Sequence, residues 1–164
     1  MIDKNLNSAI NILPFAFLLH NIEEAVSMED WIEKSPMKIS YSITTNQFVV
    51  AVALFTFMGF IVVFVKRLYK NEVQFFILIA GFSGMLLLNV FLPHLITALV
   101  FRMYVPGLIT AVLLNLPLTI YIIWHIHKSS KFSIKKIFFT IIGGGIIGIV
   151  LAYLFLLIGN LFNY

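Results

Sequence analysis

The sequence predicts an all-α membrane protein, a polytopic helix bundle of about five transmembrane helices with a cytoplasmic N-terminus and an external C-terminus. Hydrophobic residues make up 61% of the 164 residues and charged residues only 11%, and the mean hydropathy is +1.03. A soluble domain carries about 25% charged residues, so this chain cannot cover a water-facing surface. Its length suits about five spans of roughly 20 residues in one membrane-embedded domain over residues 1–164.

Five apolar stretches give the expected spans, at about residues 6–26, 46–65, 73–93, 105–124 and 137–161. The third stretch stays apolar as far as Phe101, beyond what the hydrocarbon layer requires. Pro93 lies inside it and Pro117 inside the fourth. Because proline lacks an N–H and clashes with the preceding turn, we expect a kink or a short returning segment at Pro93.

The distribution of positive charge predicts the orientation. With the N-terminus inside, eight of the eleven Lys and Arg residues lie in inner segments, and only Lys34, Lys38 and Arg102 lie outside. This asymmetry is typical of a multi-pass protein of the cell membrane. In the outer segment 27–45, Ser27 followed by Asp30 favours the start of a short helix at the membrane interface.

Composition also excludes several classes of function. The chain has no cysteine, which excludes disulfides, thiolate nucleophiles and thiolate metal sites. The net charge of +4 follows from the orientation of the loops and does not indicate nucleic-acid binding.

Ionisable residues inside a span are the informative ones, because a charge there costs about 2.5–3.5 kcal/mol on insertion scales. His20, Glu23 and Glu24 lie at i, i+3 and i+4 and therefore share one face of the first helix. Their spacing resembles the H-x-x-E-H zinc-protease pattern with Glu in the last place. By spacing, His20 and Glu24 would be metal ligands and Glu23 the general base. The alternative is that two glutamates simply end the span and begin an acidic loop.

Depth favours a shared site. Along the third span, Asn89 and His94 come about 24 and 32 Å from its start, while His20 and Glu24 come about 21 and 27 Å along the first. These estimates overlap near the outer leaflet, so we expect the first and third helices to face each other there. His125 and His127, at the inner end of the fourth span, are two residues apart and point to different helix faces, which indicates interfacial residues. Gly144 and Gly148 have the small-xxx-small spacing of close helix packing.

The residues His20-Asn21-Ile22-Glu23-Glu24 resemble the signature of the bacterial integral membrane proteins named for their HXXEE motif. Trp31, Asn89, His94 and the segment from Tyr104 to Ala111, Tyr-x-Pro-Gly-Leu-x-Thr-Ala, are similar to further features of that family. The resemblance covers roughly residues 10–120. It implies a bundle of this size and span number, and polar residues that look like an active site, without an assigned reaction.

These observations lead to one main hypothesis and two alternatives. The main hypothesis is a membrane-embedded, metal-dependent hydrolase or acyl-type transferase with a lipid-like or amphipathic substrate at the outer leaflet. His20, Glu24 and His94 would hold a divalent ion such as zinc, with one position left for water. Glu23 would accept a proton from that water, and Asn89 would orient substrate or donate to a developing oxyanion. The alternatives are a small transporter or ion-binding protein using the same carboxylates, and a structural or immunity-type membrane protein.

Overall fold

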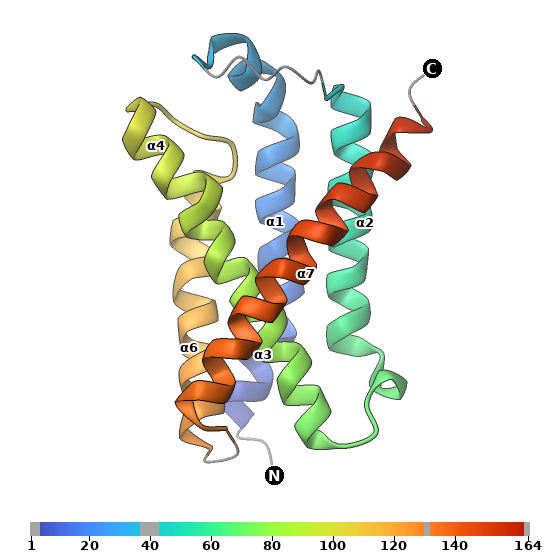
Figure 1. Cartoon of the computed structure of the whole chain (residues 1–164), viewed down its shortest axis with the longest axis vertical. Coiled ribbons are helices and arrows are strands. Elements are labelled where there is room, and N and C mark those ends of the chain that lie inside the picture. Colours follow the sequence, from blue (N-terminus) through green and yellow to red (C-terminus); the bar gives the residue numbers. More distant parts are fainter. Residues whose placement is uncertain (1–3, 37–42, 130–131, 163–164) are drawn as a thin grey trace.

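The computed structural model describes residues 4–36, 43–129 and 132–162, and within these residues all regular secondary structure is helical. Five helical passes alternate in direction (Figure 1). They are α1 (Lys4–Lys34); α2 (Thr45–Phe64), followed by the short η1 (Lys66–Leu68); α3 (Glu72–Asn89) with η2 (Val90–Leu95) and α4 (Ile96–Phe101); α5 (Leu108–Thr110) with η3 (Ala111–Asn115) and α6 (Leu116–Lys128); and α7 (Ile134–Asn160).

Four passes are long and apolar enough to cross a membrane: Thr45–Phe64, Glu72–Phe101, Leu108–Lys128 and Ile134–Asn160. The remaining pass, α1, has 31 residues and packs against α2, α3 and α6. The predicted helical membrane bundle is confirmed, and its expected count of about five spans is close to these four helices with α1 beside them. α1 begins at one end of the bundle and α7 ends at the other (Figure 1), while the assignment of these ends to the cytoplasm and the exterior stays a prediction.

Two expected boundaries are wrong. The helix expected to start at Ser27 does not exist separately, because α1 continues through it to Lys34. Ser27 Oγ donates to the carbonyl oxygen of Glu23, which satisfies a serine inside a helix instead of capping a new one. The fourth pass begins at Leu108 rather than near residue 105, because Gly107 adopts a left-handed conformation with φ +79° and ends the preceding turn.

The kink expected at Pro93 is confirmed. Leu92 has non-helical angles, φ −124° and ψ 113°, within a stretch of π-helical pairing from Val90 to Leu95. A second π segment, Ala111–Asn115, precedes Pro117. The two π segments contact each other. Such wide turns change which side chains face the interior, and they are frequent at functional sites.

Glycines set the closest helix crossing. A Cβ added to Gly144 of α7 would overlap the carbonyl of Gly81 in α3, and one added to Gly148 would overlap Met85. The packing role predicted for this small-residue spacing is therefore confirmed.

Candidate metal centre

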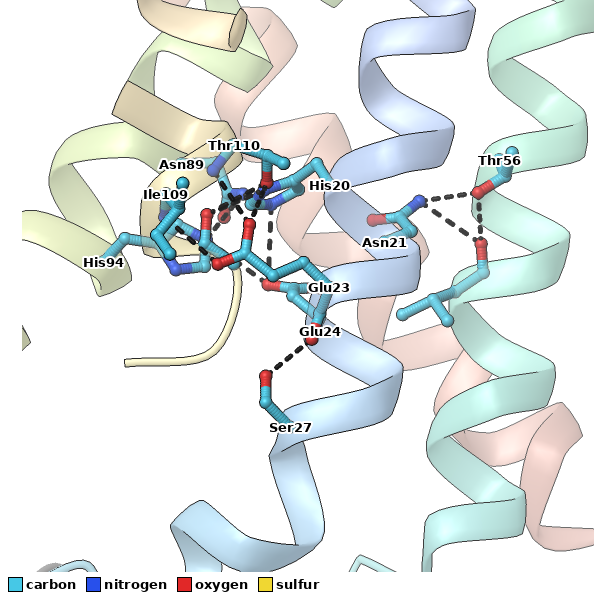
Figure 2. Close-up of polar contacts among 12 residues, drawn as sticks. His20, Asn21, Glu23, Glu24, Ser27, Thr56, Asn89, His94, Ile109 and Thr110 are labelled. Carbon is cyan, nitrogen blue, oxygen red and sulfur yellow. Dashed lines mark hydrogen bonds and ion pairs between the residues drawn. The ribbon is translucent and has the colours of Figure 1, made fainter. Parts of the chain in front are cut away.

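Three ligand-type side chains from two passes converge on one point: His20 and Glu24 from α1, and His94 from η2 (Figure 2). Their ligand atoms all lie within 4.8 Å of one another. His20 and His94 are 0% and 1% exposed, while Glu24 is partly buried. The sequence predicts these same three residues as ligands, and the expected approach of the first and third helices is confirmed.

Two of the distances fit a small divalent ion. Glu24 Oε1 lies 3.5 Å from His20 Nε2 and 3.3 Å from His94 Nε2. Metal–ligand bonds of 2.0–2.2 Å at tetrahedral angles place neighbouring ligand atoms about 3.3–3.5 Å apart. Both separations match this geometry, and the group of three could hold a metal ion.

Hydrogen bonding fixes the proton of His20 on the nitrogen that faces away from this point. His20 Nδ1 lies 3.1 Å from the carbonyl oxygen of Gly107 and 3.1 Å from Thr110 Oγ1. A carbonyl oxygen can only accept, so Nδ1 carries the hydrogen, and the Nε2 lone pair faces Glu24. Metal-binding histidines typically donate their other N–H to a backbone carbonyl in this manner.

Asn89, at the end of α3, bridges the two imidazoles. Its Nδ2 donates to His20 Nε2 at 3.0 Å and to His94 Nε2 at 3.1 Å. The two N–H groups of one amide thus engage the two lone pairs that a metal ion would use. This contact holds both rings with their Nε2 atoms turned to the same point.

Gly107 packs its bare Cα against all three ligands. A Cβ added there would lie 2.7 Å from Glu24 Cγ, 2.7 Å from His20 Cε1 and 3.0 Å from His94 Cε1. The positive φ of this residue also favours glycine. Both the backbone angle and the space around the centre therefore require glycine at this position.

Glu23 lies beside the three ligands and joins α1 to the start of α5 (Figure 2). Its carboxylate accepts hydrogen bonds from Tyr104 Oη at 2.6 Å, Ile109 N at 3.1 Å and Thr110 N at 2.8 Å, and from the Thr110 hydroxyl. Backbone N–H groups at a helix start have no partners within the helix, and a carboxylate there is stabilised. Burial, together with the bond to Glu23, raises the pKa of the Tyr104 hydroxyl, which therefore keeps the proton that it donates.

Thr110 links this anchor to the candidate metal centre, since its hydroxyl donates to Glu23 and lies within hydrogen-bond distance of His20 Nδ1. Sequence reasoning did not identify Thr110 or Gly107 as site residues. The only signal for them was their place in the segment from Tyr104 to Ala111 that resembles the HXXEE proteins.

The other singled-out residues lie outside this group. Asn21, on another side of α1, donates to Thr56 Oγ1 at 2.6 Å and ties α1 to α2 (Figure 2). His125 and His127 donate to the carbonyl oxygens of Tyr121 and Phe132 through Nδ1, at the far end of α6. The interpretation of these two histidines as interfacial residues therefore agrees with their contacts.

The fold and the site define a helical membrane protein with a His–Glu–His group that could hold a metal ion. The chain belongs to the family described as proteins of unknown function with the HXXEE motif, whose model matches residues 11–122. It is also 33% identical over 148 residues to the uncharacterized protein YrkK of Bacillus subtilis (strain 168), which covers 89% of this chain and 92% of that protein. No solved structure matches the chain. The family resemblance expected from the motif is confirmed.

Proposed function

We propose that the protein is a membrane-embedded, metal-dependent enzyme, a hydrolase or acyl-type transferase, acting near the outer leaflet of the cell membrane. The observation that carries the proposal is the convergence of His20, Glu24 and His94 at metal-ligand distances in a buried position. Two imidazoles and one carboxylate form a ligand set of catalytic zinc sites, which keep one position open. The distribution of positive charge in the loops supports the outer side for this end of α1.

The ligands have distinct tasks in this proposal. His20 and His94 present neutral Nε2 atoms, and Glu24 supplies the negative charge that holds a divalent ion, with zinc as the expected one. When bound, such an ion polarises a carbonyl or phosphoryl oxygen and makes water a competent nucleophile near neutral pH. Gly107 keeps the space against the three ligands clear of side-chain atoms.

Asn89 is suited to act on the substrate. Once the two Nε2 lone pairs are engaged by an ion, the N–H groups of Asn89 lose those acceptors. The same side chain lines the neighbouring cavity, as does Glu24. A preorganised amide donor at that place can stabilise the oxygen on which negative charge develops. This is the role that the sequence predicts for Asn89.

The general-base role of Glu23 stays a prediction, and the structure offers a second role. Four hydrogen bonds to its carboxylate occupy the lone pairs that would receive a proton. Through Thr110, the same carboxylate orients His20. These contacts favour Glu23 as a positioning residue.

Transport is less well supported by the interior of the bundle. Ion and proton pathways in membranes use chains of ionisable groups. Among the described residues, His20 and His94 are the ionisable side chains that are fully buried, and the remaining buried polar side chains are neutral amides and hydroxyls: Asn21, Gln47, Thr56, Ser83, Asn115 and Thr119. One buried ionisable centre without a chain of such groups favours an enzyme site over a pathway.

The proposal is tested by metal analysis of protein purified in nanodiscs without a polyhistidine tag. We expect about one divalent ion per chain, a marked loss in His20→Ala, Glu24→Gln and His94→Ala, and retention in Asn89→Leu. His125→Ala is the matched control, because it removes a histidine outside the group. Wild-type protein without a divalent ion, or equal loss in the control, would refute the metal centre.

Enzymatic activity needs a separate readout. A deletion strain complemented with wild-type protein or with Glu24→Gln can be compared by lipid and metabolite analysis. We expect one amphipathic class to accumulate, and its cleaved or transferred product to be depleted, in the Glu24→Gln strain. Identical profiles at equal protein levels would contradict an enzymatic role.

A further inference from the structure

A cavity of about 430 Å³ adjoins the candidate metal centre. It is a partly open cavity lined by residues of α1, α2, the third pass and α7. α3 and α7 cross where Gly81 meets Gly144, and toward the end of the bundle where α7 finishes they diverge, with α1 behind them (Figure 1). The cavity occupies this wedge, so helix packing at the glycines produces an opening at the level of the site.

The lining of the cavity is mostly apolar, and two of its three polar side chains adjoin the candidate metal centre. Three lining side chains are polar, Asn21, Glu24 and Asn89, and the others are apolar or glycine. Glu24 and Asn89 contact both imidazoles of the candidate metal centre. Along α7 the lining runs from residue 142 to residue 156, a length of about 21 Å at 1.5 Å per residue. The cavity is therefore elongated and mostly apolar, with Glu24 and Asn89 at the candidate metal centre and Asn21 beside α2.

We propose that this cavity binds one unbranched alkyl or acyl chain of a single-chain amphiphile, with the polar group of that molecule at His20, Glu24 and His94. This inference rests on the proposed function and names its substrate class. At about 30 Å³ per heavy atom, the share of a water molecule in the liquid, 430 Å³ holds one chain of about 14 atoms. The volume corresponds to one such chain and not to the two of a phospholipid.

Apolar burial favours such a chain in the cavity over water. Each buried methylene contributes about 0.8 kcal/mol relative to water. A ligand that partitions from the bilayer gains far less from burial, since lipid tails are equally apolar. The polar group at the metal ligands therefore has to determine which amphiphile stays bound, and the shape of the cavity selects the length and number of its chains.

Photolabelling with palmitic acid that carries a diazirine on its chain tests the inference in phosphatidylcholine nanodiscs. We expect saturable labelling that maps to cavity-lining residues of α2 and α7 and is competed by palmitic acid but not by a short-chain acid. Val52→Phe in α2 and Ala152→Phe in α7, which both fill the cavity, should each lower labelling by about fivefold or more, the equivalent of 1 kcal/mol of overpacking.

Matched controls place the same phenylalanine outside the cavity. Ala53→Phe in α2 and Val150→Phe in α7 change exposed positions near Val52 and Ala152 and should leave labelling unchanged. Equal labelling in all four variants, or labelling that does not saturate, would overturn the inference and show only annular lipid.

The failure of the inference is distinguishable from the failure of the proposed function. His20→Ala should lose the metal ion and weaken the labelling, while the remaining label should still map to the cavity-lining residues of α2 and α7. Metal-free wild-type protein that is labelled in the cavity would refute the enzyme proposal alone, while metal-loaded protein without saturable labelling would refute the chain site alone.

Discussion

Replacing Gly107 with alanine tests the candidate metal centre with a single methyl group. The added Cβ would lie 2.7 Å from Glu24 Cγ, 2.7 Å from His20 Cε1 and 3.0 Å from His94 Cε1. Ordinary carbon–carbon contacts are about 3.5–4.0 Å, so each ligand side chain has to retreat by roughly 0.5–1.3 Å. The added methyl group would therefore displace the side chains of all three candidate ligands.

The expected magnitude follows from two separable terms. The left-handed backbone angle, φ +79°, costs a non-glycine residue about 1–2 kcal/mol of folding stability, whether or not metal is bound. Overpacking costs about 1–3 kcal/mol. Because metal bonds near 2 Å do not tolerate ligands displaced by this much, that second term should appear as a loss of metal affinity of about 5- to 150-fold.

The assay is competition of the purified protein with a metal-sensitive chelating dye, alongside thermal unfolding. Gly143→Ala is the matched control, since no heavy atom lies within 4 Å of the Cβ it would add. Alanine there should leave metal affinity unchanged. Wild-type metal affinity in Gly107→Ala, with the protein folded, would refute the assignment of the three ligands.

Three further outcomes follow from the structure. Glu23→Gln should destabilise the fold by about 1–3 kcal/mol, because an amide cannot accept all four hydrogen bonds; complete loss of activity at unchanged thermal stability would show instead that Glu23 is the proton acceptor. Pro93→Ala restores an N–H and lets the third pass straighten, so the metal content of the protein should fall. Pro93→Gly should retain more metal than Pro93→Ala, and equal metal content in the two variants would contradict this role of Pro93. Reporter fusions placed after Tyr164 and within residues 28–40 should report the external side, and a fusion near Lys131 should report the cytoplasm. A cytoplasmic C-terminus would overturn the predicted orientation.

The helical passes could be predicted because their signal is local. α2 and α7 begin and end within about three residues of the apolar stretches, since hydrocarbon tolerates only helices there. The start of the fourth pass was missed by three residues because it depends on the left-handed angle of Gly107. That angle is set by packing against α1, which no local pattern records.

The ligands could also be predicted, but their supporting residues could not. His20, Glu24 and His94 are costly in a membrane, so their presence in apolar stretches is itself the signal. Thr110 and Gly107 act through a hydroxyl contact, a backbone carbonyl and an absent Cβ. Threonine and glycine are common in membrane helices for packing alone, so only their place in the segment from Tyr104 to Ala111 distinguishes these two in the sequence.

The interruption of the third pass explains how Asn89 and His94 reach one point. In a straight α-helix, residues five apart lie 140° around the axis and about 7.5 Å along it, too far for one amide to serve both His94 and a ring on α1. Yet Asn89 Nδ2 contacts His94 Nε2 and His20 Nε2 at nearly equal distances. The wide turn and the non-helical Leu92 shorten and rotate this stretch, so that His94 returns to the level of Asn89. The sequence estimate of depth, which assumed a straight helix, placed the two residues about 8 Å apart. The interruption at Pro93 therefore sets the position of the third candidate metal ligand, His94.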